Sequence, residues 1–278
     1  MPVIALTHEM GSLAKDVAER LAADMGLSLM RHEVEDHVAE RMHVKPSLIR
    51  RVREGKAGMF ERMRTDKTTL AIYTAEELFE LAAAGNVVLR GWGATMLLRP
   101  VQHAVRVRIT RSRANRIAWL MENLDIKDED AAAAEIRRSD DAHAHRMNEQ
   151  FGVRWGDPRL YDLVLNTDRV SVESCALMIR QLTERPEFQE TEASRAKLRN
   201  LTLAAHVRAA LRATPDTDHT DVTVEADDGH VVLRGIVVDR DELNATEEVA
   251  RRVPGVTSVV NEIRPMRTSN RFVTNSDS

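Results

Sequence analysis

Residues 3–21 read VIALTHEMGSLAKDVAERL, and this stretch decides the fold of the first part of the chain. Its first four residues are apolar and predict one short buried strand. After a turn that contains Gly11, apolar side chains recur at the helical spacing Leu13, Val17 and Leu21. A strand, a glycine turn and a helix in this order aim backbone N–H groups at a phosphate. We therefore predict a phosphate-binding turn, with the Lys15 ammonium within reach of the phosphate.

The stretch departs from the standard phosphate loop, which reads G-x-x-x-x-G-K-[ST]. Lys15 follows Ala14 rather than glycine, and Asp16 stands where the motif has a hydroxyl residue. Leu13 adds bulk where the backbone would approach the phosphate closely. The Asp16 carboxylate would either hold Mg²⁺ or repel the nucleotide. The residues alone therefore leave two interpretations open, a phosphate site and an ordinary strand-to-helix turn.

Composition indicates a mildly acidic chain that is long enough for two domains. The 278 residues carry a formal net charge of -4, with charges of both signs interspersed. This balance gives no reason to expect a nucleic-acid partner. The single cysteine, Cys175, excludes an intrachain disulfide and lies in an apolar run that predicts a buried thiol. Without a signal peptide or an apolar run of membrane-spanning length, we expect a cytoplasmic protein.

Strand-like and helix-like segments alternate through residues 1–184. Strands are predicted at residues 3–6, 87–90, 105–109 and 162–166, with a weaker one at 27–30. Helices are predicted between them at residues 76–84, 113–123 and 128–150. The alternation is typical of an α/β fold in which helices flank a parallel sheet.

A polar segment at residues 185–199 predicts a linker or an exposed helix, and a second pattern follows it. The elements expected there are a helix at 201–213, strands at 221–225 and 231–238, a helix at 239–253 and a strand at 256–263. Asp228-Gly229 is a strong hairpin signal between the two strands. We therefore predict a small αββαβ two-layer domain at residues 200–266, followed by a disordered tail at 267–278.

Five blocks of the first domain occur in the order of a known family. They read THEMGS (7–12), GNVVLRGWGA (85–94), EIRRSD (135–140), WGDP (155–158) and YDLVLNT (161–167). With these blocks, residues 1–182 resemble the cytidylate kinase-like family, within the P-loop nucleoside monophosphate kinases. The resemblance implies a P-loop kinase-type sheet, ATP and Mg²⁺, and a nucleoside monophosphate as acceptor, with CMP favoured.

Phosphoryl transfer depends on positive charge around the moving group, so basic residues near the expected loop matter most. The resemblance implies that the donor nucleotide is held by Gly11, Ser12, Lys15 and Asp16. It implies charge neutralisation during transfer by Lys15, Arg111, Arg116, Arg137, Arg138 and Arg146. It implies acceptor contacts by Arg90, Trp92 and Asp140. From spacing alone, a solvated helix face remains the alternative explanation for the arginines on residues 128–150.

The chain departs from the family at two places. Family members usually have glycine where Leu13 and Ala14 stand, and often an arginine where Trp92 stands between two glycines. Trp92 would either stack on a base or fill the acceptor pocket. Elsewhere, Glu33 and His37 share a helical face beside His32, Glu35 and Asp36, but two side chains do not make a metal site and none is expected. We expect His143 and His145 to be solvated.

The second domain has its own resemblance. Residues 222–224 (VTV), 229–235 (GHVVLRG), 253–256 (VPGV) and 259–263 (VVNEI) make residues 198–266 similar to a BON domain. That resemblance implies contact with a protein, a small ligand or a phospholipid. Three hypotheses follow for the chain: a nucleoside monophosphate kinase, a pseudokinase that senses a nucleotide or anion and signals through the BON domain, and a binding module on an inert, self-associating platform that would make a homo-oligomer.

Overall fold

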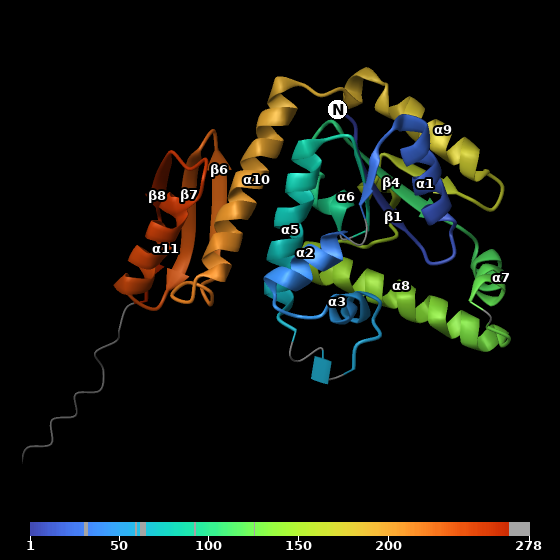
Figure 1. The fold of residues 1–278 in the computed structure, drawn as a ribbon, viewed down its shortest axis with the longest axis horizontal. Coiled ribbons are helices and arrows are strands. Elements are labelled where there is room, and N and C mark those ends of the chain that lie inside the picture. Colours follow the sequence, from blue (N-terminus) through green and yellow to red (C-terminus); the bar gives the residue numbers. More distant parts are fainter. Residues whose placement is uncertain (31–32, 59, 62–64, 92, 125, 267–278) are drawn as a thin grey trace, which may run out of the picture. The chain divides into compact units, whose positions relative to one another are not determined.

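The structure is a computed structural model that describes residues 1–30, 33–58, 60–61, 65–91, 93–124 and 126–266. The chain divides into two compact units, Met1–Arg199 and Asn200–Ser278, which are described one at a time (Figure 1). Trp92, His32 and the tail expected at residues 267–278 lie outside the described residues. Among the described helices, none combines the length and apolar character of a membrane span.

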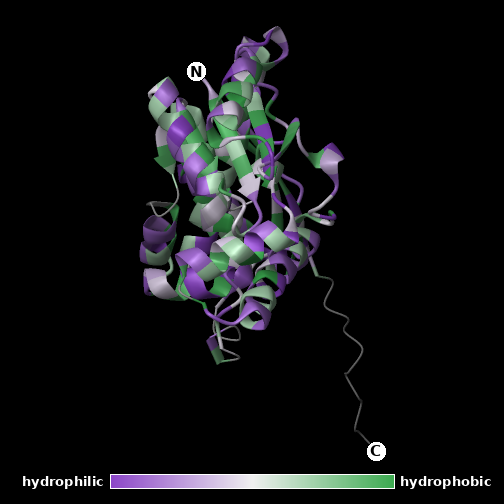
Figure 2. Cartoon of the chain, turned by 90° about the vertical axis from the view of Figure 1, so that its right-hand side faces the viewer, coloured by the Kyte–Doolittle hydropathy of each residue, from purple (hydrophilic) through white to green (hydrophobic). Residues whose placement is uncertain are grey.

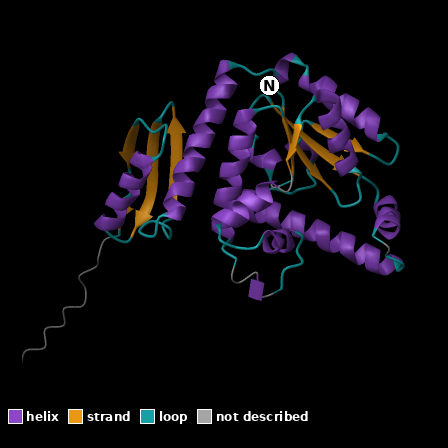
Figure 3. Cartoon of the chain, viewed as in Figure 1, coloured by secondary structure: helices purple, strands orange, loops and turns teal. Residues whose placement is uncertain are grey.

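Five parallel strands form the sheet of the N-terminal unit, in the spatial order β2-β3-β1-β4-β5 (Figure 3). They are β1 (Val3–His8), β2 (Ser28–Met30), β3 (Val87–Arg90), β4 (Ala104–Thr110) and β5 (Leu163–Asn166). Leu6 on the central strand lies beside Arg90 on one side and Val107 on the other. The continuous apolar runs predicted such strands because both faces of a parallel sheet are covered. The expected α/β fold is confirmed.

Helices cover the sheet, and α1 (Ala14–Met25) packs with α9 (Val172–Thr183) in one core cluster with the strands. Val17, Leu21 and Cys175 are fully buried in this cluster, as the helical spacing and the apolar run around Cys175 predicted. The helices carry both hydrophilic and hydrophobic residues, as expected when one face of each meets a core (Figure 2). The others are α2 (Glu33–Arg41), α3 (Pro46–Arg53), α5 (Lys67–Ala84), α6 (Ala94–Leu97), α7 (Arg113–Asn123), α8 (Glu129–Phe151), η1 (Pro158–Leu160) and η2 (Pro186–Phe188).

Two helices begin earlier than the periodicity indicated. Helix α5 begins at Lys67 rather than residue 76, because the Asp66 carboxylate accepts hydrogen bonds from the backbone N–H groups of Thr68 and Thr69 and caps the helix. Helix α10 (Glu192–Ala213) begins within the polar segment at 185–199. That segment was expected to be a linker or an exposed helix, and its second half is helical.

The C-terminal unit has the predicted αββαβ order. Strands β6 (Val222–Asp227) and β7 (His230–Val237) pair antiparallel around a hairpin in which Asp228 and Gly229 both have positive φ, and β8 (Ser258–Asn261) runs parallel to β7. Helix α11 (Arg240–Arg252) and the second part of α10 supply Ala250 and Val207 to the core of this sheet. The structure adds one short strand, β9 (Arg264–Pro265), beside β7.

Candidate functional site

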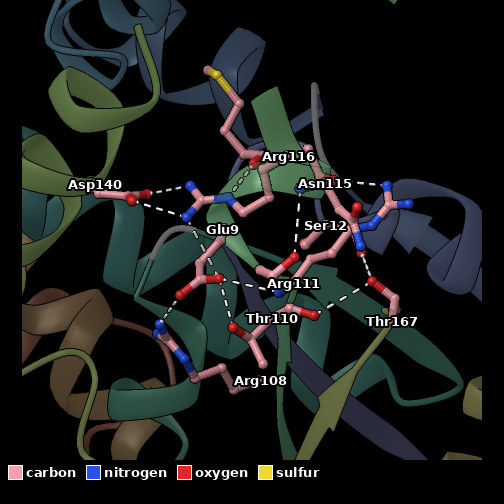
Figure 4. A network of polar contacts seen from close by, with 12 residues as sticks. Glu9, Ser12, Arg108, Thr110, Arg111, Asn115, Arg116, Asp140 and Thr167 are labelled. Atoms are coloured by element: carbon pink, nitrogen blue, oxygen red, sulfur yellow. Dashed lines mark hydrogen bonds and ion pairs between the residues drawn. The ribbon is translucent and has the colours of Figure 1, made fainter. Parts of the chain in front are cut away.

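The carboxyl ends of β1, β4 and β5 meet at one edge of the parallel sheet, and the candidate site lies there (Figure 4). Residues 9–13 follow β1, Arg111 follows β4, and Thr167 and Asp168 follow β5. Open α/β sheets bind ligands in the crevice outside the carboxyl ends of their strands. The phosphate-binding turn that the sequence predicts therefore occupies the usual ligand position of this architecture.

The turn at residues 9–13 is closed by its own backbone. Ser12 N–H donates to the Glu9 carbonyl at 3.2 Å, and Gly11 has a φ of 78°. Leu13 precedes α1 in the left-handed region, with φ 59° and ψ 17°, and no side chain among the described residues caps the helix there. Backbone N–H groups in the first turn of a helix have no intrahelical partner. Together with the helix dipole, they make the start of α1 attractive to an anion.

Ser12 and Arg111 bring unused hydrogen-bonding groups to this turn. Ser12 is 1% exposed, and its hydroxyl oxygen has no partner within the described part of the chain. Nη1 of Arg111 lies 3.5 Å from the Gly11 carbonyl, whereas its Nε makes no hydrogen bond there and lies 3.9 Å from Asp168. A buried polar group without a partner costs about 1–3 kcal/mol. A bound phosphate would supply the missing partners.

A carboxylate that the sequence analysis did not single out lies at the centre of the site. Glu9 accepts hydrogen bonds from Arg108 Nη2 at 2.7 Å, from the Thr110 hydroxyl at 2.6 Å and from Arg111 N–H at 3.2 Å. Arg116 Nη1 lies 3.6 Å from the same carboxylate. The available signal was the pair of charged residues, Arg106 and Arg108, inside the mainly apolar run of β4, since an arginine in a covered strand requires an anionic partner.

Arg116 and Asp140 were both expected near substrate, and the structure brings them together. The Arg116 side chain is 5% exposed and makes a two-pronged contact with the Asp140 carboxylate, at 3.0 and 2.6 Å. Its Nε donates to the Met10 carbonyl at 2.7 Å. Arg116 thus connects the turn after β1 to helix α8, and its guanidinium is already engaged with protein groups.

Four other predicted residues are exposed. Lys15 is 61% exposed, and its ammonium is 3.6 Å from Glu19, one helical turn toward the carboxyl end of α1. The exposed residue Arg138 pairs with Glu135 on α8, and Arg137 is exposed on the same helix. Asp16 is exposed in the first turn of α1 and remains close to the turn in sequence.

Arginines are also found near the end of β3. Arg90 is buried, and a Cβ atom on Gly91 would lie 3.1 Å from Nη2 of Arg53. Arg53 donates to the buried Glu35 carboxylate at 3.0 Å, and its own carbonyl accepts a hydrogen bond from Arg146. Arg90 and Arg146 were expected from the sequence, whereas Arg53 was not, because its segment shows no motif.

His143 was expected to be solvated, and this prediction is wrong. Its ring stacks on Trp155 with centroids 5.0 Å apart, and its Nδ1 lies 3.0 Å from the Ser139 carbonyl. Burial, followed by the nearby Arg146 guanidinium, lowers the pKa of His143 to about 4, so the ring is neutral at pH 7. His145 is exposed beside Glu149, because it points away from that packed side of α8.

The strain at Leu13 gives a first testable prediction. A non-glycine residue in the left-handed region costs roughly 1–2 kcal/mol. We expect the free energy of unfolding of Leu13→Gly to exceed that of Leu13→Ala by about 1 kcal/mol. At positions with ordinary backbone angles the order is reversed, because glycine is then the less stable choice. Both variants lose the same leucine contacts, so urea unfolding of the pair isolates the backbone conformation. Equal stability, or a more stable alanine variant, would contradict a left-handed Leu13.

Comparisons with known proteins agree with this architecture. The model of the cytidylate kinase-like family matches residues 3–169, and the BON domain model matches residues 200–264. No curated protein matches the chain. An uncharacterized protein from Eubacterium ventriosum ATCC 27560 is 21% identical, with a TM-score of 0.53 over 66% of this chain and all of that one, which supports the fold.

Two other solved structures are shikimate kinases. The one from Bacteroides thetaiotaomicron is 16% identical with a TM-score of 0.43, over 66% of this chain and 99% of that chain. The one from Acinetobacter baumannii, in complex with shikimate, is 12% identical with a TM-score of 0.38, over 66% of this chain and 92% of that chain. The family match spans more than half of the chain and includes the turn after β1 and the ends of β3, β4 and β5. The chain belongs to the cytidylate kinase-like family and carries a C-terminal BON domain.

Proposed function

We propose that the N-terminal unit binds the phosphates of ATP at the turn after β1 and transfers the γ-phosphoryl group to a nucleoside monophosphate, with CMP as the favoured acceptor. The observation that carries this proposal is the buried Ser12 hydroxyl, which has no partner in the described chain and lies directly before the uncapped start of α1. Membership of the cytidylate kinase-like family supports the reaction class. ATP-dependent transfer also fits a cytoplasmic protein.

Different residues would bind the phosphates of the donor nucleotide and the phosphate of the acceptor. Backbone N–H groups at the start of α1 and the Ser12 hydroxyl would hold the donor phosphates, and Arg111 would supply positive charge beside them. The Ser12 hydroxyl and the Asp16 carboxylate are oxygen donors of the kind that suits Mg²⁺, which neutralises phosphate charge when it is bound. Arg90, Arg53 and Arg146 would face the acceptor phosphate near Gly91.

A matched pair of variants tests this assignment. We expect Arg111→Gln to weaken MgATP binding at least about tenfold, because a charge-assisted contact to phosphate is lost. Lys15→Gln should change binding less than about twofold, because the ammonium lies toward Glu19 and is exposed. Titration calorimetry measures binding, and ADP formation with CMP, UMP or AMP measures turnover. Loss of MgATP binding in Lys15→Gln but not in Arg111→Gln would mean that Lys15 rather than Arg111 holds the phosphates, and would contradict this assignment.

A second candidate function is a pseudokinase. It is favoured by Arg116, whose guanidinium is occupied by Asp140 and the Met10 carbonyl rather than being available to a transferring group. In this case the chain would bind a nucleotide without turnover and signal through its BON domain to a protein, small ligand or phospholipid. MgATP binding without acceptor-dependent ADP formation, for every nucleoside monophosphate tried, would favour this candidate over the kinase.

A further inference from the structure

Hydrogen-bond donors surround the Glu9 carboxylate in the way that they would surround a bound anion. Two guanidinium groups, one hydroxyl and one backbone N–H converge on it, from Arg108, Arg116, Thr110 and Arg111. The side chains of Arg108 and Arg116 are only 8% and 5% exposed. Charges at that depth are tolerated only with a partner of opposite charge. Glu9 therefore does for these donors what a small bound anion would do (Figure 4).

The backbone of the same residue shapes the turn. The Glu9 carbonyl accepts the Ser12 N–H at 3.2 Å, and the Glu9 N–H donates to the Ile109 carbonyl at 3.3 Å. Arg116, which also approaches the Glu9 carboxylate, holds the Met10 carbonyl at 2.7 Å. One residue thus anchors the turn to β4 and, through Arg116, to α7.

We propose that Glu9 is a positioning residue that fixes the phosphate-binding turn in its binding shape before any ligand arrives. The inference rests on the proposed function of this turn. The strained φ of 59° at Leu13 supports it, because such a conformation persists only where surrounding contacts determine it. A turn held by protein contacts keeps Leu13 in this conformation before a ligand binds. A turn that is already ordered also loses less conformational entropy when the nucleotide binds.

The test removes the carboxylate and then returns it from solution. In Glu9→Ala we expect the Tm of the N-terminal unit to fall by about 5 °C, amide exchange at residues 9–13 to accelerate, and the Kd for MgATP to rise about tenfold. Sodium formate should partly reverse all three effects, whereas sodium chloride at equal ionic strength should not. Glu9→Gln should resist rescue, because its amide fills the space without the charge. Glu122→Ala, an exposed carboxylate on α7, is the matched control.

The outcomes separate this inference from the proposed function. If the wild type does not bind MgATP, the proposed function fails, while the Tm, amide exchange and formate measurements still test the role of Glu9 in shaping the turn. If Glu9→Ala weakens binding but leaves amide exchange at residues 9–13 unchanged, Glu9 acts on the nucleotide directly and the inference is overturned. If Glu9→Ala does not fold, Thr110→Val removes one donor to the carboxylate and should accelerate exchange in the same turn; unchanged exchange would overturn the inference.

Discussion

Gly11→Ala is expected to destabilise the N-terminal unit by about 3 kcal/mol and to abolish MgATP binding. Gly11 has a φ of 78°, and a Cβ atom there would lie 3.1 Å from the Arg116 carbonyl oxygen and 3.3 Å from the Arg116 Cα. The cost has two parts, because the dihedral is unfavourable for alanine and the new atom meets the backbone of α7. Relief would require the turn to move away from α7, which would also displace the Ser12 hydroxyl.

Gly26→Ala is the matched control for this prediction. Gly26 ends helix α1 with a φ of 63°, and a Cβ atom there would meet nothing within 4 Å. It should therefore cost only the conformational part, about 1 kcal/mol. Urea unfolding followed by circular dichroism gives both values, and titration calorimetry gives nucleotide binding. If the two variants were equally stable, the contact between the turn and α7 would not be rigid, and the argument for a tightly packed turn would fail.

The sequence was sufficient for the sheet because its signals are local. Residues 3–6 form a short apolar run, residues 87–89 form another that is followed by Arg90, and both segments are buried in interior strands of the sheet. The Asp228-Gly229 signal likewise depends on positive φ at adjacent residues, and both angles are positive in the structure. Features that depend on a few neighbouring residues can be predicted from one sequence.

The candidate site could be predicted only in outline, because its main contacts join distant segments. Glu9 and Arg108 pair across 99 positions, and Arg53 reaches Gly91 from a segment without a motif. The direction of the Lys15 side chain could not be predicted from the sequence either. An exposed lysine at the start of a helix can point toward the preceding loop or toward an acidic residue one turn later. In the structure it turns toward Glu19.

Asp140→Ala is expected to destabilise the N-terminal unit by about 3 kcal/mol, because it leaves the buried Arg116 guanidinium without its main partner. Arg116 is 5% exposed and donates to Asp140 at 3.0 and 2.6 Å, while Glu9 lies farther away at 3.6 Å. The loss should also loosen the turn after β1, because the same guanidinium holds the Met10 carbonyl. Nucleotide affinity should therefore fall along with stability, although Asp140 need not touch the nucleotide.

Asp141→Ala provides the control, since Asp141 is the next residue on α8 and is exposed. We expect it to change the free energy of unfolding by less than about 0.5 kcal/mol. In the double variant Arg116→Leu with Asp140→Ala, neither partner of this ion pair remains. Its loss in the free energy of unfolding should therefore be smaller than the sum of the losses in the two single variants. Urea unfolding of the four proteins, wild type included, measures this coupling. Additive losses would mean that the two side chains do not depend on each other, and Arg116 would then be free to approach a transferring phosphoryl group.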